Sequence, residues 1–179
     1  LFRTKLSENL FKGLSPWMQK LPGGLIHVNI VGCALFAAIS GSSAATVATV
    51  GKMSIPELRK RKYPEKILLG SLAGSGTLGL LIPPSIILII YGVTVQESIA
   101  KLFIAGILPG IMIAAIFMLY IVFWSLLNKK IMPKSFENFS FFEKIKQSKQ
   151  LLPVIILILA VIGSIYTGVA TATEAASLG

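Results

Sequence analysis

The sequence predicts an all-α polytopic membrane protein, and three observations support this fold class. Of its 179 residues, 54% are hydrophobic, and the mean hydropathy of +0.80 is far above that of a soluble domain. The single cysteine excludes a disulfide-stapled secreted module. Four stretches contain no Asp, Glu, Lys or Arg, and each exceeds the roughly 20 residues that span a bilayer core as a helix. These stretches are residues 21–51, 67–96, 102–128 and 151–173.

The charges between these stretches predict the topology. The net charge is +10, and the 17 basic residues lie in four places. Four lie within 1–20, six within 52–66, one within 97–101 and six within 129–150. Short basic loops stay on the cytoplasmic side, so we expect three of these connections inside and residues 97–101 outside. Basic clusters beside membrane spans meet anionic lipid head groups, which explains the charge without a nucleic-acid partner.

The basic connections differ in character. Residues 1–20 carry Leu6, Leu10 and Leu14 at near-helical spacing, which predicts an interfacial arm helix. Residues 52–66 are expected to form a basic cytoplasmic loop. Residues 129–150 alternate charged, amide and phenylalanine side chains, which is typical of a cytoplasmic arm at the membrane surface.

Residues 21–51 have basic flanks on both sides, which conflicts with a single crossing. One continuous helix of this length would measure about 46 Å, against a hydrocarbon core of about 30 Å. Ser and Gly weaken the helix near its middle, so we expect a re-entrant hairpin whose tip is buried in protein or lines a wet cavity. The alternative is one long tilted helix whose small residues allow close packing. The tip would consist of Ser40, Gly41, Ser42 and Ser43.

Residues 67–96 are predicted to form a broken transmembrane helix. Two consecutive prolines remove backbone donors, and the first disfavours the helical conformation of Ile82. Ser85 is placed to cap the second half-helix. Discontinuous helices are the best sequence indication of a transporter's binding site, whereas the alternative is a proline kink with packing glycines. The residues of the break are Gly76, Thr77, Gly79, Pro83, Pro84 and Ser85.

The remaining segments predict further spans. Residues 97–128 contain an ordinary transmembrane helix with a bend near Pro109. Residues 151–179 contain a transmembrane helix and then a second cluster of small and hydroxyl residues, which we interpret as the start of a second hairpin entered from the outer side. That arrangement is expected of an inverted-repeat transporter, of which this chain would hold one half.

Several motifs follow one another in an order that one family of membrane proteins shares. They are GGLIHVNI at 23–30, SGSSAA at 40–45, GTLGLLIPPS at 76–85, YGV at 91–93, SIAKLFIAG at 98–106 and TATEAA at 171–176. Together they resemble the large membrane permease subunit, DctM-type, of a TRAP transporter. The resemblance is dense over residues 21–120 and looser over 151–179, and it identifies the chain as an internal fragment of such a subunit.

The resemblance implies secondary transport of an organic acid, a carboxylate or a sialic-acid-like compound, across a bacterial or archaeal cytoplasmic (inner) membrane. It implies Na⁺-coupled symport by an elevator-like mechanism, with Na⁺ as coupling ion and no cofactor. It also implies two partners, a small TRAP membrane subunit and a periplasmic substrate-binding protein. By motif, one Na⁺ would lie near Ser42, Ser43 and Thr77, beside part of the substrate site. The second hairpin tip is matched by Thr171, Thr173 and Glu174.

The same residues support other functions less well. The chain has no Asp, and its Glu residues lie in loops or at Glu174, so the first site has no carboxylate to carry a proton. His27 is the only histidine and is expected to be a hydrogen-bonded polar anchor, which leaves Ser42 or Ser43 without a base and argues against an enzyme. Two alternatives stay open: a divalent-anion/Na⁺ symporter-type permease without a binding protein, and a non-transporting membrane scaffold.

Overall fold

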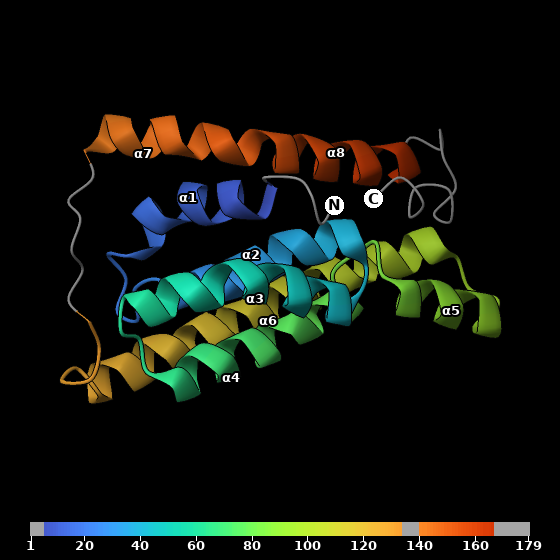
Figure 1. The fold of residues 1–179 in the computed structure, drawn as a ribbon. Coiled ribbons are helices and arrows are strands. Elements are labelled where there is room, and N and C mark those ends of the chain that lie inside the picture. Colours follow the sequence, from blue (N-terminus) through green and yellow to red (C-terminus); the bar gives the residue numbers. More distant parts are fainter. Residues whose placement is uncertain (1–5, 134–139, 167–179) are drawn as a thin grey trace.

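A computed structural model describes residues 6–133 and 140–166, and the regular structure within these ranges is helical throughout, which confirms the all-helical fold class (Figure 1). Thr171, Thr173 and Glu174 lie outside the described residues. In chain order the elements are α1 (Leu6–Met18), α2 (Ile26–Ser40), α3 (Ser43–Lys60), α4 (Glu65–Gly76), the 3₁₀ helix η1 (Thr77–Leu80), α5 (Ile86–Val95), α6 (Ile99–Leu127), α7 (Phe141–Ser148), the 3₁₀ helix η2 (Lys149–Leu151) and α8 (Leu152–Tyr166).

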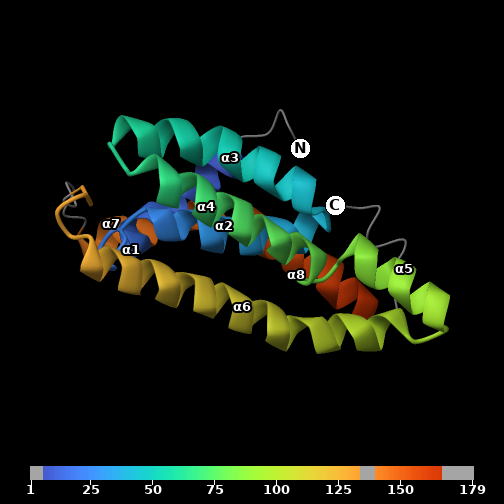
Figure 2. The same cartoon turned by 90° about the horizontal axis from the view of Figure 1, so that it is seen from below.

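Helix α2 is the centre of the fold. It packs against α3 and α4, while α1 covers it on one side and α6 runs along another (Figures 1 and 2). Eleven of its 15 residues are buried, including Ile26 and Phe36. A helix that is apolar all round has no face to present to water, so it takes the interior position.

Residues 21–51 contain a hairpin of two helices, because α2 ends and α3 begins beside it in the opposite direction (Figure 1). Gly41 ends α2 with φ +58°, and its N–H donates to the Ala37 carbonyl at 3.0 Å. Glycine adopts this left-handed conformation without steric cost, so the chain can reverse within two residues. Because the chain reverses here, residues 21–51 do not form the one long tilted helix that was the alternative prediction.

Residues 67–96 contain a true break rather than a kink. Helix α4 ends at Gly76, the chain tightens into η1, and residues 81–85 are not helical before α5 starts at Ile86. The Pro83–Pro84 peptide bond is cis. The freed backbone groups of this segment need partners in a membrane, and the hairpin tip provides partners for two of them, the Gly76 carbonyl and the Ile86 N–H.

The basic loop expected at residues 52–66 is mostly helical, which corrects that boundary. Helix α3 continues to Lys60, and residues 61–64 alone connect it to α4. Ion pairs support the extension, since Arg61 binds Glu57 at 2.8 Å within the last turn of α3 and Arg59 binds Glu65 at the start of α4. These pairs stabilise the polar end of α3, which continues beyond the charge-free stretch 21–51 from which the loop boundary was predicted.

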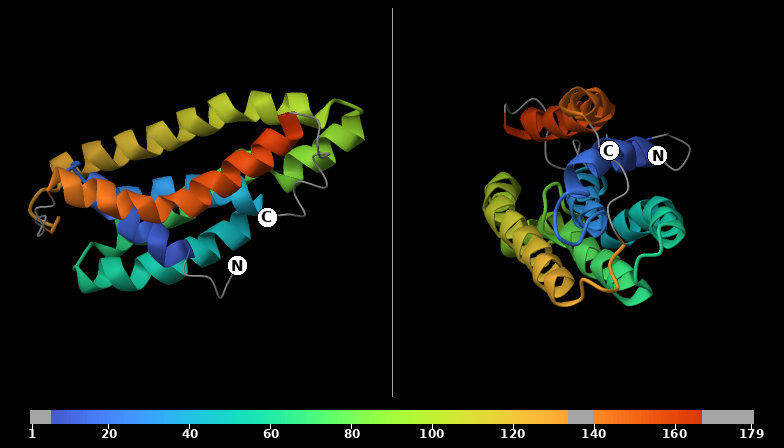
Figure 3. Two further views of the ribbon diagram at one scale, coloured as in Figure 1. Left: turned by 90° about the horizontal axis from the view of Figure 1, so that it is seen from above. Right: turned by 90° about the vertical axis from the view of Figure 1, so that its left-hand side faces the viewer.

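Two helices in the described part of the chain are long and apolar enough to cross a membrane, Ile99–Leu127 and Phe141–Ile165. The second combines α7, η2 and α8, so it begins ten residues before the expected position 151. Its α7 and η2 parts pack on α1, whereas its α8 part also contacts α2 of the hairpin directly (Figure 3). Large apolar side chains such as Leu108 (76% exposed) and Phe123 (67%) cover the outer flank of α6, a surface suited to lipid or protein rather than water.

Candidate functional site

The tip of the hairpin sits directly on the broken helix at Gly79. A Cβ atom at this position would lie 2.8 Å from the Ser43 nitrogen and 2.9 Å from the Ser42 carbonyl carbon. Both neighbours are backbone atoms, which cannot move aside as a flexible side chain can. The absence of a side chain at Gly79 therefore lets the two backbones touch.

A second backbone contact joins Gly41 to the start of α5. A Cβ atom at Gly41 would lie 2.7 Å from the Pro84 carbonyl oxygen. The Ile86 N–H donates to the Gly41 carbonyl at 3.3 Å, which satisfies one of the first amides of α5. Gly41 is thus needed twice, for the turn of the hairpin and for the approach of the second half-helix.

A third contact joins Ser43 and the end of α4. The Ser43 hydroxyl donates to the Gly76 carbonyl at 2.6 Å, so a carbonyl left without a partner at the helix end gains a donor. A side chain at Gly76 would overlap Val47 of α3. The sequence-predicted residues Gly41, Ser43, Gly76 and Gly79 therefore come together in one interface.

The other tip serines organise the turn itself. The Ser42 hydroxyl caps α3 by accepting from the Ala45 N–H at 3.5 Å. The Ser40 hydroxyl hydrogen-bonds the Thr46 hydroxyl at 2.9 Å, and the Ser42 carbonyl accepts from the Thr46 N–H at 3.0 Å. Thr46 is fully buried and was missed by the sequence reasoning, although a hydroxyl in the first turn of an apolar helix was the available signal.

Thr77 differs from the expected grouping with Ser42 and Ser43. Its side chain is exposed, and its hydroxyl donates back to the Gly74 carbonyl at 2.6 Å. Residues three apart eclipse in a 3₁₀ helix, so Gly76 and Gly79 share the face that meets the tip while Thr77 lies on another face. The structure therefore brings the tip serines to the glycines of the break and leaves the Thr77 hydroxyl out of that contact.

Ser85 and the two prolines also take other roles than a cap. Ser85 is buried at the start of α5, yet its hydroxyl donates to the Leu80 carbonyl at 2.6 Å and makes no side-chain cap. The end of η1 leaves that carbonyl in need of a donor, which explains the correction. Pro83 and Pro84 line a small apolar hollow with Phe103 of α6 and Ile162 of α8, so their rings pack rather than bind polar groups.

A buried polar bridge fixes the hairpin to α4 below the tip. The Asn29 side-chain amide donates to the Ser71 hydroxyl at 2.9 Å and to the Leu68 carbonyl at 3.2 Å, and the Ser75 hydroxyl donates to the Asn29 carbonyl at 3.4 Å. These bonds use the Asn29 amide nitrogen and backbone carbonyl, while the side-chain oxygen Oδ1 is buried without a partner. The bridge links α2 to α4, and α3 packs against both, so the three helices form one packed unit that carries the tip and the first half of the break.

His27 is the polar anchor that the sequence indicated. Its ring nitrogen Nε2 lies 2.8 Å from the Pro22 carbonyl, and the side chain is fully buried at the start of α2. Ser42 lies beyond the other end of the same helix, about 20 Å away at 1.5 Å per residue. His27 is therefore too far from the tip serines to act as their base.

The site offers neutral oxygen atoms and helix ends. The ends of α2 and η1 present carbonyls, and the starts of α3 and α5 present amides, all around the Gly41–Ser43 tip. Within residues 6–133 and 140–166, no three His, Cys, Asp or Glu side chains gather to hold a metal ion. Carbonyl and hydroxyl oxygens suit a hard cation, and amide-bearing helix starts suit a carboxylate.

The chain resembles a well-defined group of membrane proteins. The profile of the DctM component of the tripartite ATP-independent periplasmic transporters matches residues 1–179. The C4-dicarboxylate TRAP transporter large permease protein DctM of Pseudomonas aeruginosa is 38% identical over 156 residues, which cover 87% of this chain and 36% of that protein.

Relatives named for other substrates also match most of the chain. The sialic acid TRAP transporter permease protein SiaT of Haemophilus influenzae is 36% identical over 172 residues, covering 96% of this chain and 27% of that protein. The ectoine/5-hydroxyectoine TRAP transporter large permease protein UehC of Ruegeria pomeroyi is 34% identical over 175 residues, covering 98% of this chain and 40% of that protein. The chain thus spans between about a quarter and two fifths of the length of these relatives.

Proposed function

Since the chain belongs to the DctM family of the tripartite ATP-independent periplasmic transporters, we propose that it supplies one half of the ion and substrate site of an organic-acid importer in a bacterial or archaeal cytoplasmic membrane. The relatives are named for C4-dicarboxylates, sialic acid and ectoine, and each of these compounds carries at least one carboxylate. A carboxylate-bearing solute is therefore the substrate class that we assign.

This proposal rests on one observation, the direct backbone contact between the hairpin tip and the broken helix. Gly79 meets the backbone of Ser42 and Ser43, and Gly41 meets Pro84. Two helices start and two end around this contact, so positive and negative ends of backbone dipoles face one small region. Transporters with discontinuous helices bind anionic substrates at helix starts and coupling cations at carbonyl-bearing helix ends.

The same donor set favours Na⁺ as the coupling ion. The described tip and break contain hydroxyls and carbonyls but no carboxylate, so proton coupling would lack a titrating group there. We assign the Na⁺ to the neutral oxygens around Ser42 and Ser43, with Thr77 facing a different part of the site. Thr171, Thr173 and Glu174 would complete the site from the second hairpin of the full-length protein.

The proposed membrane placement is re-entrant. The start of α2 and the loop after α3 lie together, because the Tyr63 hydroxyl accepts from the Leu25 N–H at 3.0 Å. Both segments carry basic flanks, which favours the cytoplasmic side for both ends of the hairpin. The packed unit of α2, α3 and α4 would then move as one body, as an elevator-like mechanism requires.

The proposed partners are a small TRAP membrane subunit and a periplasmic binding protein that delivers the substrate. The test uses the full-length parent protein in proteoliposomes with an inward Na⁺ gradient. We expect uptake of a C4-dicarboxylate or sialic acid that needs both Na⁺ and the binding protein. Uptake without the binding protein would favour the divalent-anion symporter alternative. A folded protein that takes up neither class of acid would contradict the proposal and favour the scaffold.

The contribution of the tip is tested by Ser43→Ala, since the change removes the donor to the Gly76 carbonyl. We expect a lower apparent Na⁺ affinity with an intact fold. Ser15→Ala is the matched control, because Ser15 likewise donates to a backbone carbonyl, that of Phe11, and does so within α1, which leads into the start of α2 rather than its tip. Equal Na⁺ affinities in the Ser43 variant and the unaltered protein would argue against Na⁺ at this contact.

A further inference from the structure

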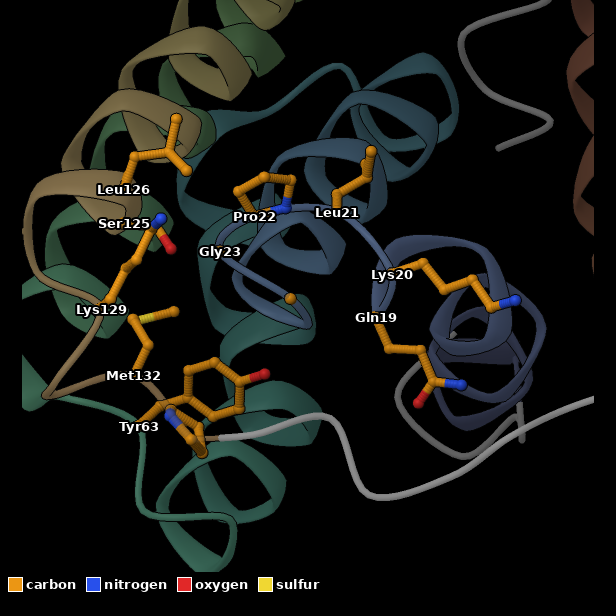
Figure 4. A pocket seen from close by; sticks show the side chains of 12 residues that line it. Gln19, Lys20, Leu21, Pro22, Gly23, Tyr63, Ser125, Leu126, Lys129 and Met132 are labelled. Atoms are coloured by element: carbon orange, nitrogen blue, oxygen red, sulfur yellow. The ribbon is translucent and has the colours of Figure 1, made fainter.

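A second cavity lies at the basic end of the molecule, far along α2 from the hairpin tip. It has a volume of about 340 Å³, within the range of small-ligand sites. Three segments line it: the connection from α1 to α2, Tyr63 between α3 and α4, and the end of α6 with the residues that follow it. Figure 4 shows Ser125 and Lys129 on one side of the hollow, Gln19 and Lys20 on the other, and Tyr63 below.

The described lining of the cavity is positively charged. Lys20 and Lys129 contribute ammonium groups, and none of the described lining residues is Asp or Glu. In the α3–α4 region, Glu57 pairs with Arg61 and Glu65 with Arg59. The Lys20 side chain extends outward from the rim, where a flexible stem can reach a head group at the surface (Figure 4).

Buried polar side chains line the cavity beside this charge. Gln19 and Ser125 are each only 6% exposed and line it from opposite sides, and the Ser125 hydroxyl adds a hydrogen-bond donor. The lysines therefore stand at the edge of a polar recess rather than on an open surface. Phosphate oxygens accept hydrogen bonds from ammonium, amide and hydroxyl donors of this kind.

The apolar surface that continues from the cavity indicates a lipid rather than a free anion. Leu126 lines the cavity, and Leu127 (72% exposed) and Phe123 (67%) extend along the outer flank of the membrane-spanning α6. A head group in the recess would place its acyl chains along this flank. The basic loops put the same end of the molecule on the cytoplasmic side, where anionic lipids attract basic segments.

We propose that this basic pocket, formed by Gln19, Lys20, Tyr63, Ser125 and Lys129, binds the phosphate of an anionic membrane phospholipid whose acyl chains lie along α6. The pocket joins the start of the hairpin, the α3–α4 loop and the end of α6. A bound lipid therefore bridges the packed unit of α2, α3 and α4 to α6. This binding is separate from transport, and it rests on the proposed membrane placement of α6 with the basic end of the molecule on the cytoplasmic side.

The test measures phospholipid binding to the purified full-length parent protein in detergent by native mass spectrometry. Phosphatidylglycerol is compared with phosphatidylcholine, and the double variant Lys20→Gln, Lys129→Gln with the unaltered protein. Lys52→Gln with Lys101→Gln is the matched control, because it removes two exposed lysines outside the pocket and leaves the same net charge. Thermal unfolding in phosphatidylcholine alone checks that each variant is folded.

We expect phosphatidylglycerol to bind preferentially, and the pocket variant to weaken that binding by about 10-fold or more while the control changes it little. Unchanged binding in the pocket variant, or equal weakening in both variants, would overturn the proposal, since the attraction would then be general electrostatics. Inorganic phosphate that displaces the lipid at millimolar concentration would overturn the lipid as occupant and indicate a free-anion site.

Discussion

Replacing Gly79 by alanine is the sharpest probe of the contact between the hairpin tip and the broken helix. The added methyl group would lie 2.8 Å from the Ser43 nitrogen and 2.9 Å from the Ser42 carbonyl carbon, where an ordinary contact starts at 3.4 Å. The tip and η1 must therefore separate by about 0.6 Å, the difference between 3.4 and 2.8 Å. Overpacking of this kind costs about 1–3 kcal/mol.

The cost is expected to appear in ion binding. If Na⁺ and substrate bind only when the tip is seated, 1–3 kcal/mol corresponds to a loss of roughly 5- to 150-fold in apparent affinity. The assay is Na⁺ dependence of uptake by the full-length parent protein in proteoliposomes, with expression and thermal unfolding measured in parallel. We expect Gly79→Ala to raise the Na⁺ concentration needed for half-maximal uptake, or to abolish uptake.

Gly70→Ala is the matched control on the same broken helix. Nothing lies within 4 Å of a Cβ atom at Gly70, so the change adds a methyl group to open space. Alanine favours a helix over glycine by about 0.5–1 kcal/mol, so this variant should fold at least as well as the unaltered protein. Normal Na⁺ dependence in Gly79→Ala, or equal damage in both variants, would refute the reasoning.

Three further changes test the surrounding packing, each by thermal unfolding of the full-length parent protein in detergent. Asn29→Ala removes the buried bridge from α2 to α4 and should destabilise the protein by about 1–3 kcal/mol, whereas Asn128→Ala at the end of α6 should cost less; equal effects would contradict the bridge. Tyr63→Phe leaves the Leu25 N–H without its acceptor and should cost about 1–2 kcal/mol, and no change would show that water replaces the hydroxyl. Gly41→Ala forces a side chain into a left-handed turn and against Pro84 and should be the most damaging of the three; full stability would contradict the described tip.

Local chemistry made much of the fold predictable. The four charge-free stretches indicated membrane helices, and the serine and glycine cluster at Ser40–Ser43 indicated where the first stretch reverses. Consecutive prolines marked the second interruption. In each case the signal lies within a few neighbouring residues, because glycine, serine and proline act on their own backbone.

What the sequence did not reveal depends on irregular backbone conformation in the break and on contacts between distant residues. Ser85 was expected to cap α5, but the carbonyl of Leu80 five residues earlier is its partner. The orientation of Thr77 follows from the 3₁₀ conformation of η1, which a helical reading of residues 67–96 does not anticipate. The Asn29 bridge and the basic pocket join segments about 40 to more than 100 residues apart, so neither has a local pattern.

The proposed function depends most on a hairpin that enters and leaves the membrane on the cytoplasmic side, and site-directed thiol labelling of the full-length parent protein in intact cells tests this. Lys20→Cys, Lys62→Cys and Glu97→Cys are introduced singly into a background in which Cys33 and any other native cysteine are replaced. An impermeant thiol reagent should label position 97 from outside and positions 20 and 62 only after the membrane is opened. Labelling of positions 20 and 62 from opposite faces would contradict the account.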